Sequence, residues 1–334
     1  MIALSMWKAK ILRLAFTLNG AIGDLRLHRF SAVRAVRPRV RQVLFRLLAP
    51  RDVLLVRFGG LLMYIHATKV FVSNYILCNY ESYAVELFKS AIKDGATILD
   101  LGANVGYFSL IAAGQTGPNG KIYAFEPAPD NFNLLTRNIR VNGLPNIMPI
   151  QKAVGSESKS MTLFLSESPD MHSLNPHPVS TTKGTMEVEC TTIDDFMDGR
   201  GVDVIKIDVE GNELHALNGM TKTIATSQSP VLFLELNPAC LRQAHFEPEA
   251  LLLKLWNLGF EVHLINEAAR SLAPLTREFI EQIKGKPVGW VANLYCAKNP
   301  AEMRRGREES VEPKSSSLVA TSAPQGGILK TSKR

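Results

Sequence analysis

The sequence predicts an α/β fold in which helices cover both faces of a mostly parallel sheet. Strand-like and helix-like patterns alternate along much of the chain, which is typical of βαβ units. The central strand candidates are almost continuously apolar, as expected for strands that are buried on both faces. In addition, turn-forming residues follow the first of these strands at once, in the stretch ILDLGANVGYFSL at 98–110.

Each element is predicted from a local pattern. Two apolar stretches at 61–67 and 69–73 predict a hairpin, and a helix is expected over 81–93. The alternating part predicts strands at 97–101, 121–125, 147–151, 202–208 and 231–236, and helices at 105–114, 129–141, 212–226 and 247–258. Further strands are expected at 160–166, 186–193, 261–265 and 289–297. No clear helical period separates the last two strands, so we expect an antiparallel strand at the edge of the sheet.

The positive charge of the chain is concentrated at its ends. The 334 residues include 38 Lys or Arg and 31 Asp or Glu, and residues 1–60 hold 12 of the former but only 2 of the latter. Residues 301–334 are polar, rich in serine and aperiodic, which indicates disorder. We therefore expect a basic helical arm over 1–58, the main domain over 59–300 and a disordered tail over 301–334.

The basic arm allows more than one interpretation. It could contact anionic lipid, pack on the main domain, or serve as a transit peptide, although its few hydroxyl residues fit the last option weakly. Arg13 interrupts any secretory signal, and no apolar run is long enough to span a bilayer. We expect a cytoplasmic protein, with peripheral contact at the inner membrane surface as one role of the arm. Residues 61–300 carry 19 basic against 25 acidic residues, which disfavours a nucleic-acid partner.

The loop after the first strand predicts a site for an adenosine-type ligand. Gly102, Asn104 and Gly106 allow the backbone to come close to a ligand at the carboxyl end of the strand. The next strand ends in Glu126, where a carboxylate can accept hydrogen bonds from a ribose diol. Asp100 would repel a pyrophosphate but suits a cation, which favours S-adenosylmethionine over a dinucleotide. A glycine-rich turn without a ligand is the alternative.

Three stretches together resemble the FkbM family of S-adenosylmethionine-dependent methyltransferases. They are ILDLGANVGYFSL at 98–110, AFEPAPDNFNLLTRNI at 124–139 and DVIKIDVEGNELHAL at 203–217. The resemblance covers about residues 75–265 and implies the class I, Rossmann-like methyltransferase fold, a seven-stranded, mostly parallel sheet flanked by helices, with an antiparallel last strand. It also implies that Pro127, and Glu81 of the Tyr-Glu pair that precedes the first helix, contact the cofactor.

A second group of acidic residues follows two later strands. Asp208 and Glu210 come at the end of one strand, Glu213 begins the next helix, and Glu235 ends the following strand. Because the carboxyl ends of parallel strands share one edge, these carboxylates should lie together and need a cation, a proton or hydrogen-bond donors. Asp208 and Glu210 are candidates for a catalytic base or for ligands of a divalent metal. For Glu213 alone, stabilisation of the helix N-terminus is an equal alternative.

The long polar loop at 166–185 is a further candidate part of the site. Loops of this length in a compact domain are commonly functional, and this one follows the third strand, near the expected acceptor. Within this loop, His172 and Ser173 have the side chains best suited to take part in a reaction. His172 is a third candidate catalytic group, beside Asp208 and Glu210. We expect His177 to be exposed, and His215, His245 and His263 to be ordinary structural histidines. The four cysteines lie far apart without a CxxC pair, so we expect buried thiols.

The leading hypothesis is an O-methyltransferase that acts on a hydroxyl of a small molecule. The resemblance implies that the acceptor is a sugar, a glycan or a glycolipid. The alternatives are an RNA methyltransferase that uses the basic arm, and a non-catalytic, membrane-associated module with the same fold. The set of acidic and glycine residues named above argues against a degenerate site.

Overall fold

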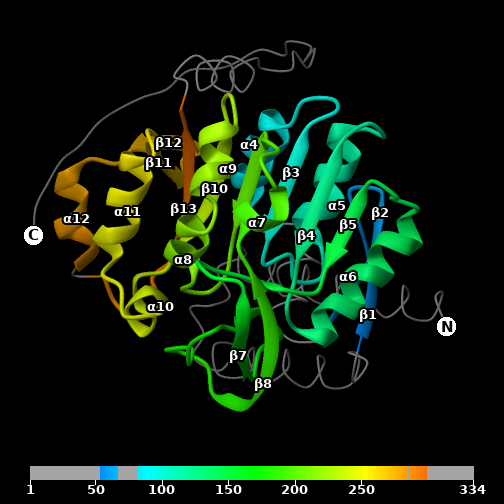
Figure 1. Ribbon diagram of the computed structural model, residues 1–334, viewed down its shortest axis with the longest axis horizontal. Helices are drawn as coiled ribbons and strands as arrows, with labels where there is room; N and C mark the ends of the chain where they lie inside the picture. Colours follow the sequence, from blue (N-terminus) through cyan, green and yellow to red (C-terminus); the bar gives the residue numbers. More distant parts are fainter. Residues whose placement is uncertain (1–52, 67–80, 285, 299–334) are drawn as a thin grey trace, which may run out of the picture.

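The computed structural model describes residues 53–66, 81–284 and 286–298, and a central eight-stranded sheet organises this part of the chain (Figure 1). Its strands lie in the order β12-β11-β13-β10-β9-β3-β4-β5. The strands from β10 to β5 in this order are mutually parallel, whereas β13 is antiparallel to both of its neighbours. The strands are β3 (Thr97–Leu101), β4 (Lys121–Phe125), β5 (Ile147–Ile150), β9 (Val204–Ile207), β10 (Val231–Leu236), β11 (Glu261–Asn266), β12 (Ser271–Pro274) and β13 (Ala292–Ala297).

This topology confirms the predicted fold class and corrects the position of the antiparallel strand. Seven strands form the expected sheet, and the last of them in the chain, β13, is antiparallel as the resemblance implies. It does not lie at the edge, because it inserts between β10 and β11. The edge is occupied by an additional short strand, β12, which pairs antiparallel with β11.

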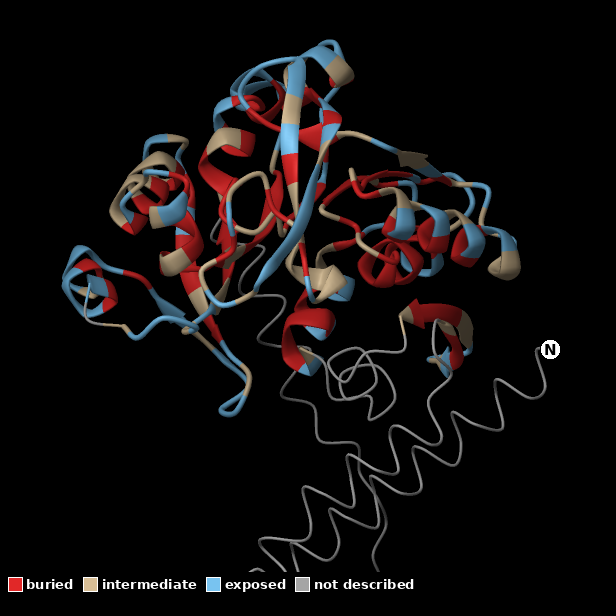
Figure 2. Cartoon of the chain, turned by 90° about the horizontal axis from the view of Figure 1, so that it is seen from below, coloured by how far each residue is buried: buried red, intermediate tan, exposed pale blue. Residues whose placement is uncertain are grey.

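Helices cover both faces of the sheet, and successive residues of one strand belong to different cores. Ile98 packs in one hydrophobic cluster and Leu99 in the other, as the two-residue period of a strand requires. Buried residues accordingly gather in the strands and on the inner sides of the helices (Figure 2). One face is covered by α4 (Ser82–Ala91), α5 (Tyr107–Thr116) and α6 (Pro129–Asn142), and the other by α7 (Ile193–Met197), α8 (Glu213–Asn218), α9 (Thr221–Thr226), α11 (Pro248–Asn257) and α12 (Arg277–Lys284).

The helix expected at 212–226 is divided in two, because the backbone of another segment approaches it closely. Gly219 separates α8 from α9, and a Cβ atom there would lie 2.0 Å from the carbonyl oxygen of Gly155. The short helix α10 (Pro238–Gln243), the helix α12 and the strand β12 were not predicted. The cysteines within the described ranges, Cys190, Cys240 and Cys296, are buried free thiols as expected.

The N-terminal hairpin lies earlier in the chain than predicted. Strand β1 (Val53–Phe58) pairs antiparallel with β2 (Leu61–His66), so β1 falls within the segment expected to be arm, and the predicted boundary at residue 58 coincides with the end of β1. The predicted strand 69–73, the arm up to residue 52 and the tail from 301 lie outside the described residues. Among the described helices, none has the length and apolar character needed to cross a bilayer.

Two asparagine side chains of α6 make hydrogen bonds to the backbone of β2, as a neighbouring strand would. Asn138 Oδ1 accepts the N–H of Tyr64 at 2.6 Å while its Nδ2 donates to the Tyr64 carbonyl at 2.9 Å. Asn142 repeats both bonds with Leu62, at 2.8 and 2.6 Å. The spacing of four residues places both side chains on one face of the helix, and they match alternate residues of the strand. The hairpin is thereby fixed to α6 by four hydrogen bonds.

A small three-stranded sheet extends from the carboxyl ends of the main strands. It consists of β6 (Ala153–Val154), β8 (Thr182–Thr191) and β7 (Lys159–Ser166), in this spatial order, and β7 and β8 project beyond the main sheet at the bottom of Figure 1. The segment 167–181 that connects them, called the strap below, contains the short 3-10 helix η3 (Pro169–Met171). Asn131 Nδ2 donates to the Pro169 carbonyl at 2.9 Å, which holds the strap to the start of α6.

Candidate active site

One cavity of about 360 Å³ lies at the carboxyl ends of the parallel strands, between the main sheet and the strap. In folds of this kind ligands bind at this edge. The cavity collects nine of the ten residues that the sequence predicts for the site: Glu81, Asp100, Gly102, Asn104, Glu126, Pro127, His172, Asp208 and Glu210. Gly106, the tenth, does not line the cavity.

The loop after β3 does not present a row of free amides. The N–H groups of Gly102 and Ala103 both donate to the Phe125 carbonyl, at 3.0 and 2.8 Å, and that of Gly106 donates to the Ala103 carbonyl at 2.8 Å. The Asn104 N–H donates to Glu126 Oε2 at 2.8 Å. A pyrophosphate would need these donors for itself, so the loop is unsuited to a dinucleotide.

Two glycines of this loop are required by close packing. At Gly102, with φ of +82°, a Cβ atom would lie 1.8 Å from the carbonyl oxygen of Asp208. At Gly106, with φ of +94°, it would lie 2.6 Å from Leu135 of α6. Gly102 therefore brings the loop of β3 against the end of β9, and Gly106 allows α6 to pack beside the first turn of α5. Gly106 shapes the loop from behind the cavity.

Glu126 is a buried carboxylate with one oxygen on each side of a turn. Its Oε2 accepts the Asn104 N–H, while its Oε1 accepts the Ala128 N–H at 2.9 Å and lies 3.5 Å from Asn131 Nδ2. Burial raises the pKa of Glu126 to about 7, against the opposing effect of these donors. A carboxylate has about four acceptor positions, so it can still accept hydrogen bonds from a diol in the cavity.

Asp100 is anchored from α5. Ser109 Oγ donates to Asp100 Oδ2 at 2.5 Å, and burial raises the pKa of this aspartate to about 6. Glu81, at the N-terminus of α4, also lines the cavity, and burial raises its pKa. Among the described residues, no donor reaches Glu81 Oε2 or Asn104 Oδ1, although both atoms are buried. Buried acceptors of this kind are costly unless a ligand satisfies them.

Lys206 supplies the cation that the acidic group requires. Its side chain is 3% exposed, and its Nζ lies 2.9 Å from Asp208 Oδ2 and 4.9 Å from the centre of the Phe108 ring. The pKa of Lys206 lies above its ordinary value because Asp208, Glu81 and Glu235 outweigh its burial. A lysine inside an apolar strand was not recognised as part of the site, although its position two residues before Asp208 puts both on one face of β9.

The remaining carboxylates of the group hold protons more readily than free side chains. Burial and the neighbouring Glu210 and Asp208 raise the pKa of Glu235 well above its ordinary value. Burial raises the pKa of Glu213 to about 8, and Glu213 Oε1 accepts the Gly211 N–H at 3.0 Å. Glu213 does not line the cavity. Oxygens of Asp208, Glu210 and Glu235 lie within 4.8 Å of one another, so this part of the site could also hold a divalent cation.

His172 lies in the cavity, but its hydrogen bond makes it a poor base. Its Nδ1 accepts the Ser166 N–H at 3.0 Å, and burial lowers its pKa. In the neutral ring the proton therefore sits on Nε2, so His172 can donate a hydrogen bond toward the cavity but has no free lone pair.

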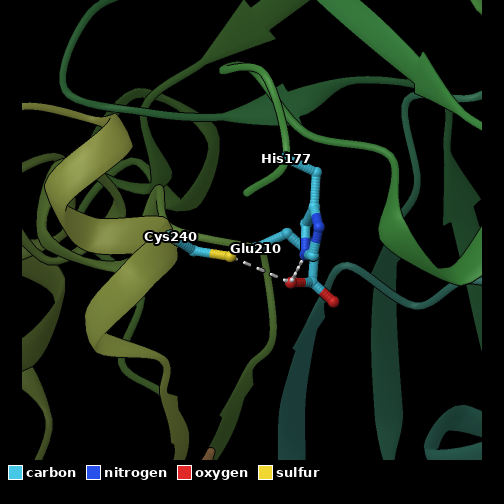
Figure 3. A group of neighbouring side chains, drawn as sticks. All are labelled: His177, Glu210 and Cys240. Carbon is cyan, nitrogen blue, oxygen red and sulfur yellow. Dashed lines mark hydrogen bonds and ion pairs between the residues drawn. The ribbon is translucent and has the colours of Figure 1, made fainter. Parts of the chain in front are cut away.

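His177 is buried, which corrects the expectation that it is exposed. Its side chain is 3% exposed, and its Nε2 lies 3.3 Å from Glu210 Oε2. Cys240 of α10 contacts the same oxygen, with its Sγ at 3.7 Å (Figure 3). Ser173, which the sequence did single out, donates to the Glu210 carbonyl at 2.6 Å. The strap therefore closes on Glu210. No local pattern revealed His177 because its partner comes from a distant part of the chain.

The strand order is that of the class I methyltransferase fold, whose usual cofactor is S-adenosylmethionine, and the cavity lies at the edge of the sheet where such folds bind ligands. Residues 100–262 match the family model for the methyltransferase FkbM domain, a stretch of just under half of the chain. The cofactor fits the residues present, because its ribose suits Glu126 and its amino group suits the unsatisfied acceptors of Glu81 and Asn104.

Two curated proteins and one solved structure illustrate what the chain is similar to. A hexuronic acid methyltransferase, AglP, of Haloferax volcanii is 29% identical over 148 residues, which cover 43% of this chain and 58% of that protein. Methyltransferase 1 of Beauveria bassiana is 28% identical over 148 residues, 38% of this chain and 59% of that protein. The chain thus spans less than two thirds of either relative. A methyltransferase FkbM from Methylobacillus flagellatus aligns over 79% of this chain and 60% of that chain, with 17% identity and a TM-score of 0.38, which is too loose to carry an argument.

Proposed function

We propose that the protein transfers a methyl group from S-adenosylmethionine to a hydroxyl oxygen of a small-molecule acceptor. The observation that carries this proposal is the carboxylate group of Asp208, Glu210 and Glu235 around Lys206, at the carboxyl ends of β9 and β10. It touches the cofactor loop, because the Asp208 carbonyl lies directly beside Gly102. A hydroxyl must lose a proton as it is methylated, and a carboxylate of raised pKa is suited to accept it.

We propose that the acceptor is a sugar, free or as part of a glycan or glycolipid. Seven carboxylates line the cavity, which offers many acceptors to the hydroxyl groups of a sugar. The name of the Haloferax volcanii relative, a hexuronic acid methyltransferase, supports the same class. The lining carboxylates are Glu81, Asp100, Glu126, Asp170, Asp208, Glu210 and Glu235.

Different residues of the chain would bind the cofactor and the acceptor. Glu126 would hold the ribose, and Glu81 with Asn104 would hold the amino end. When bound, the cofactor supplies an electrophilic methyl group on a positively charged sulfur. Lys206 would hold the Asp208 carboxylate in place through their 2.9 Å contact, and the strap would shield the acceptor side from water. The main contribution of the protein is then to position the acceptor hydroxyl beside a proton acceptor.

The test is a methyl-transfer screen in which the product is located by mass spectrometry and NMR. Neutral sugars, uronic acids and glycolipids are the acceptors, with amine and free carboxylate compounds as controls. Glu210→Gln should lower kcat by about a hundredfold or more while cofactor affinity, measured by calorimetry, stays within about twofold. Glu189→Gln on the exposed strand β8 serves as the matched control. A methyl group found on nitrogen, or parent-like turnover in Glu210→Gln, would reject the proposal.

A further inference from the structure

The carboxylate of Glu210 is held by its surroundings through only one of its two oxygens. Both side-chain contacts, from His177 Nε2 at 3.3 Å and Cys240 Sγ at 3.7 Å, reach Oε2. Within residues 53–66, 81–284 and 286–298, no donor reaches Oε1. Figure 3 shows this second oxygen directed away from both partners. The two oxygens of one side chain therefore have different environments.

The second ring nitrogen of His177 fixes which way its hydrogen bond runs. The Val179 N–H donates to His177 Nδ1 at 3.3 Å. In the neutral ring Nδ1 must then carry the lone pair, and Nε2 must carry the proton. Nε2 consequently donates to Glu210 Oε2, and it does so whether the ring is neutral or charged.

Cys240 is also a donor to Oε2. Burial, and the neighbouring Glu210, Glu213 and Glu235, raise the pKa of the Cys240 thiol. The thiol thus keeps its proton and directs it at Oε2. The backbone reinforces this arrangement: Glu210 has φ of +48°, and a Cβ atom at Gly211 would lie 2.6 Å from the Cys240 carbonyl oxygen. The turn at 209–212 is therefore pressed against α10 while the strap holds its other side.

We propose that His177 is a positioning residue that, with Cys240, occupies Oε2 of Glu210 and so leaves Oε1 as the atom that takes the proton of the acceptor hydroxyl. This inference rests on the proposed function for the identity of the acceptor group. In the step, the O–H bond of the acceptor breaks, the proton passes to Oε1, and the electron pair stays on the acceptor oxygen, which becomes the nucleophile. Glu210 changes from the carboxylate to the neutral acid.

The other acidic groups of the cavity are less suited to this step. Asp208 Oδ2 is already occupied by Lys206 Nζ at 2.9 Å. Burial, together with Glu210 and Asp208, raises the pKa of Glu235 well above its ordinary value. His172 has no free lone pair. The titratable groups that interact with Glu210 are His177 and Asp170 of the strap, Asp208 after β9, Glu213 of α8, Glu235 of β10 and Cys240 of α10, and Lys206 lies beyond Asp208 and Glu235.

A metal ion on His177, Glu210 and Cys240 is the competing interpretation. The three ligand atoms lie within 4.8 Å of one another, and bond lengths of about 2.0–2.3 Å would place tetrahedral zinc ligands about 3.3–3.7 Å apart. Ligation through Nε2, however, needs the proton on Nδ1. That proton would face the Val179 N–H, which instead donates to Nδ1. The hydrogen bond on the far side of the ring decides against a metal.

The first experiment uses NMR of the full chain and needs no acceptor. With ¹⁵N-labelled histidine, neutral His177, identified by its loss in His177→Leu, should show the proton on Nε2. With ¹³C-labelled glutamate, identified by Glu210→Gln, the pKa of Glu210 should rise by about one to two units in His177→Leu, since a hydrogen bond to a charged acceptor is lost. His177→Gln keeps a donor and should restore most of the shift. His215→Gln, on the outer side of α8, is the matched control and should leave Glu210 unchanged.

Three results would overturn the proposal: a proton on Nδ1 of His177, an unchanged Glu210 titration in His177→Leu, or loss of the Nε2 proton when zinc is added. If His177→Leu does not fold, Cys240→Ala against Cys240→Ser tests the same oxygen, and only the alanine variant should raise the pKa of Glu210. With an acceptor in hand, His177→Leu should also move the acidic limb of the kcat profile to higher pH. A protein that passes the NMR tests but methylates no hydroxyl would refute the proposed function and leave the positioning of Glu210 intact.

Discussion

Replacing Lys206 by methionine should destabilise the domain strongly, because it removes the buried cation of the site. Methionine has a similar length and can keep the packing against Phe108. The carboxylate of Asp208 loses its partner at 2.9 Å, and Glu81 and Glu235 lose the charge that attracts them. Breaking a buried ion pair on one side costs about 3–5 kcal/mol. Because the side chain of Asp208 is 26% exposed, water can replace part of the lost contact, and we expect about 3 kcal/mol.

Urea unfolding at neutral pH, followed by circular dichroism, measures this loss. A change of about 3 kcal/mol should lower the midpoint by about 1 M or more. The double variant Lys206→Met with Asp208→Asn should recover part of the stability, because the unpaired charge is then absent. Lys159→Met is the matched control, since Lys159 makes an exposed ion pair with Glu157 and such pairs contribute little. A midpoint in Lys206→Met equal to that of the control would refute the view that Lys206 neutralises the site.

Two further predictions concern the cofactor side. Glu126→Gln places an amide NH₂ where an oxygen accepts the N–H of Asn104 or Ala128. The affinity for S-adenosylmethionine, measured by calorimetry, should therefore fall about tenfold or more. If the variant binds as tightly as the exposed control Glu187→Gln, Glu126 does not hold the ribose. Without cofactor, the free energy of unfolding should be lower at pH 8 than at pH 5. Between pH 4.5 and about 7, Glu126 keeps its proton in the folded protein but releases it in the unfolded chain. The folded state therefore loses about 3 kcal/mol of stability as the pH rises through this range. Equal stability at both pH values would contradict the raised pKa.

The sequence predicted the elements whose pattern is set by burial alone. Strands β4 and β10 begin and end where expected, at 121–125 and 231–236, because they are short apolar runs bounded by turn-forming residues. The single helix predicted at 212–226 is interrupted at Gly219, where the backbone of Gly155 comes too close for a side chain. Strand β1 was not predicted, because the apolar stretch 53–58 was assigned to the arm.

The cofactor half of the site was more predictable than the acceptor half. Asp100, Asn104 and Glu126 belong to one continuous strand–loop–helix pattern and its neighbour, so local sequence order already places them together. Lys206 and His177 act through contacts across the fold, with Asp208 and Glu210 respectively. Lys206 carried a usable signal, since a lysine two residues from an aspartate in an apolar strand shares its face. The contact of His177 with Glu210 forms only when the strap folds back over the site, so no local pattern predicts it.

The contact between Gly102 and the Asp208 carbonyl has a consequence for how such enzymes diversify. The two loops that meet there follow adjacent strands, β3 and β9, and neighbouring strands are about 4.8 Å apart in every sheet. The spacing of these two loops is therefore a property of the sheet itself, whereas the shape offered to the acceptor depends on the strap. Exchanges at strap positions other than Ser173 and His177, which hold Glu210, can alter which molecule is methylated while the contact between the two loops is kept. New specificity is then accessible through changes in one surface segment, and a library randomised there should retain cofactor binding in most of its members.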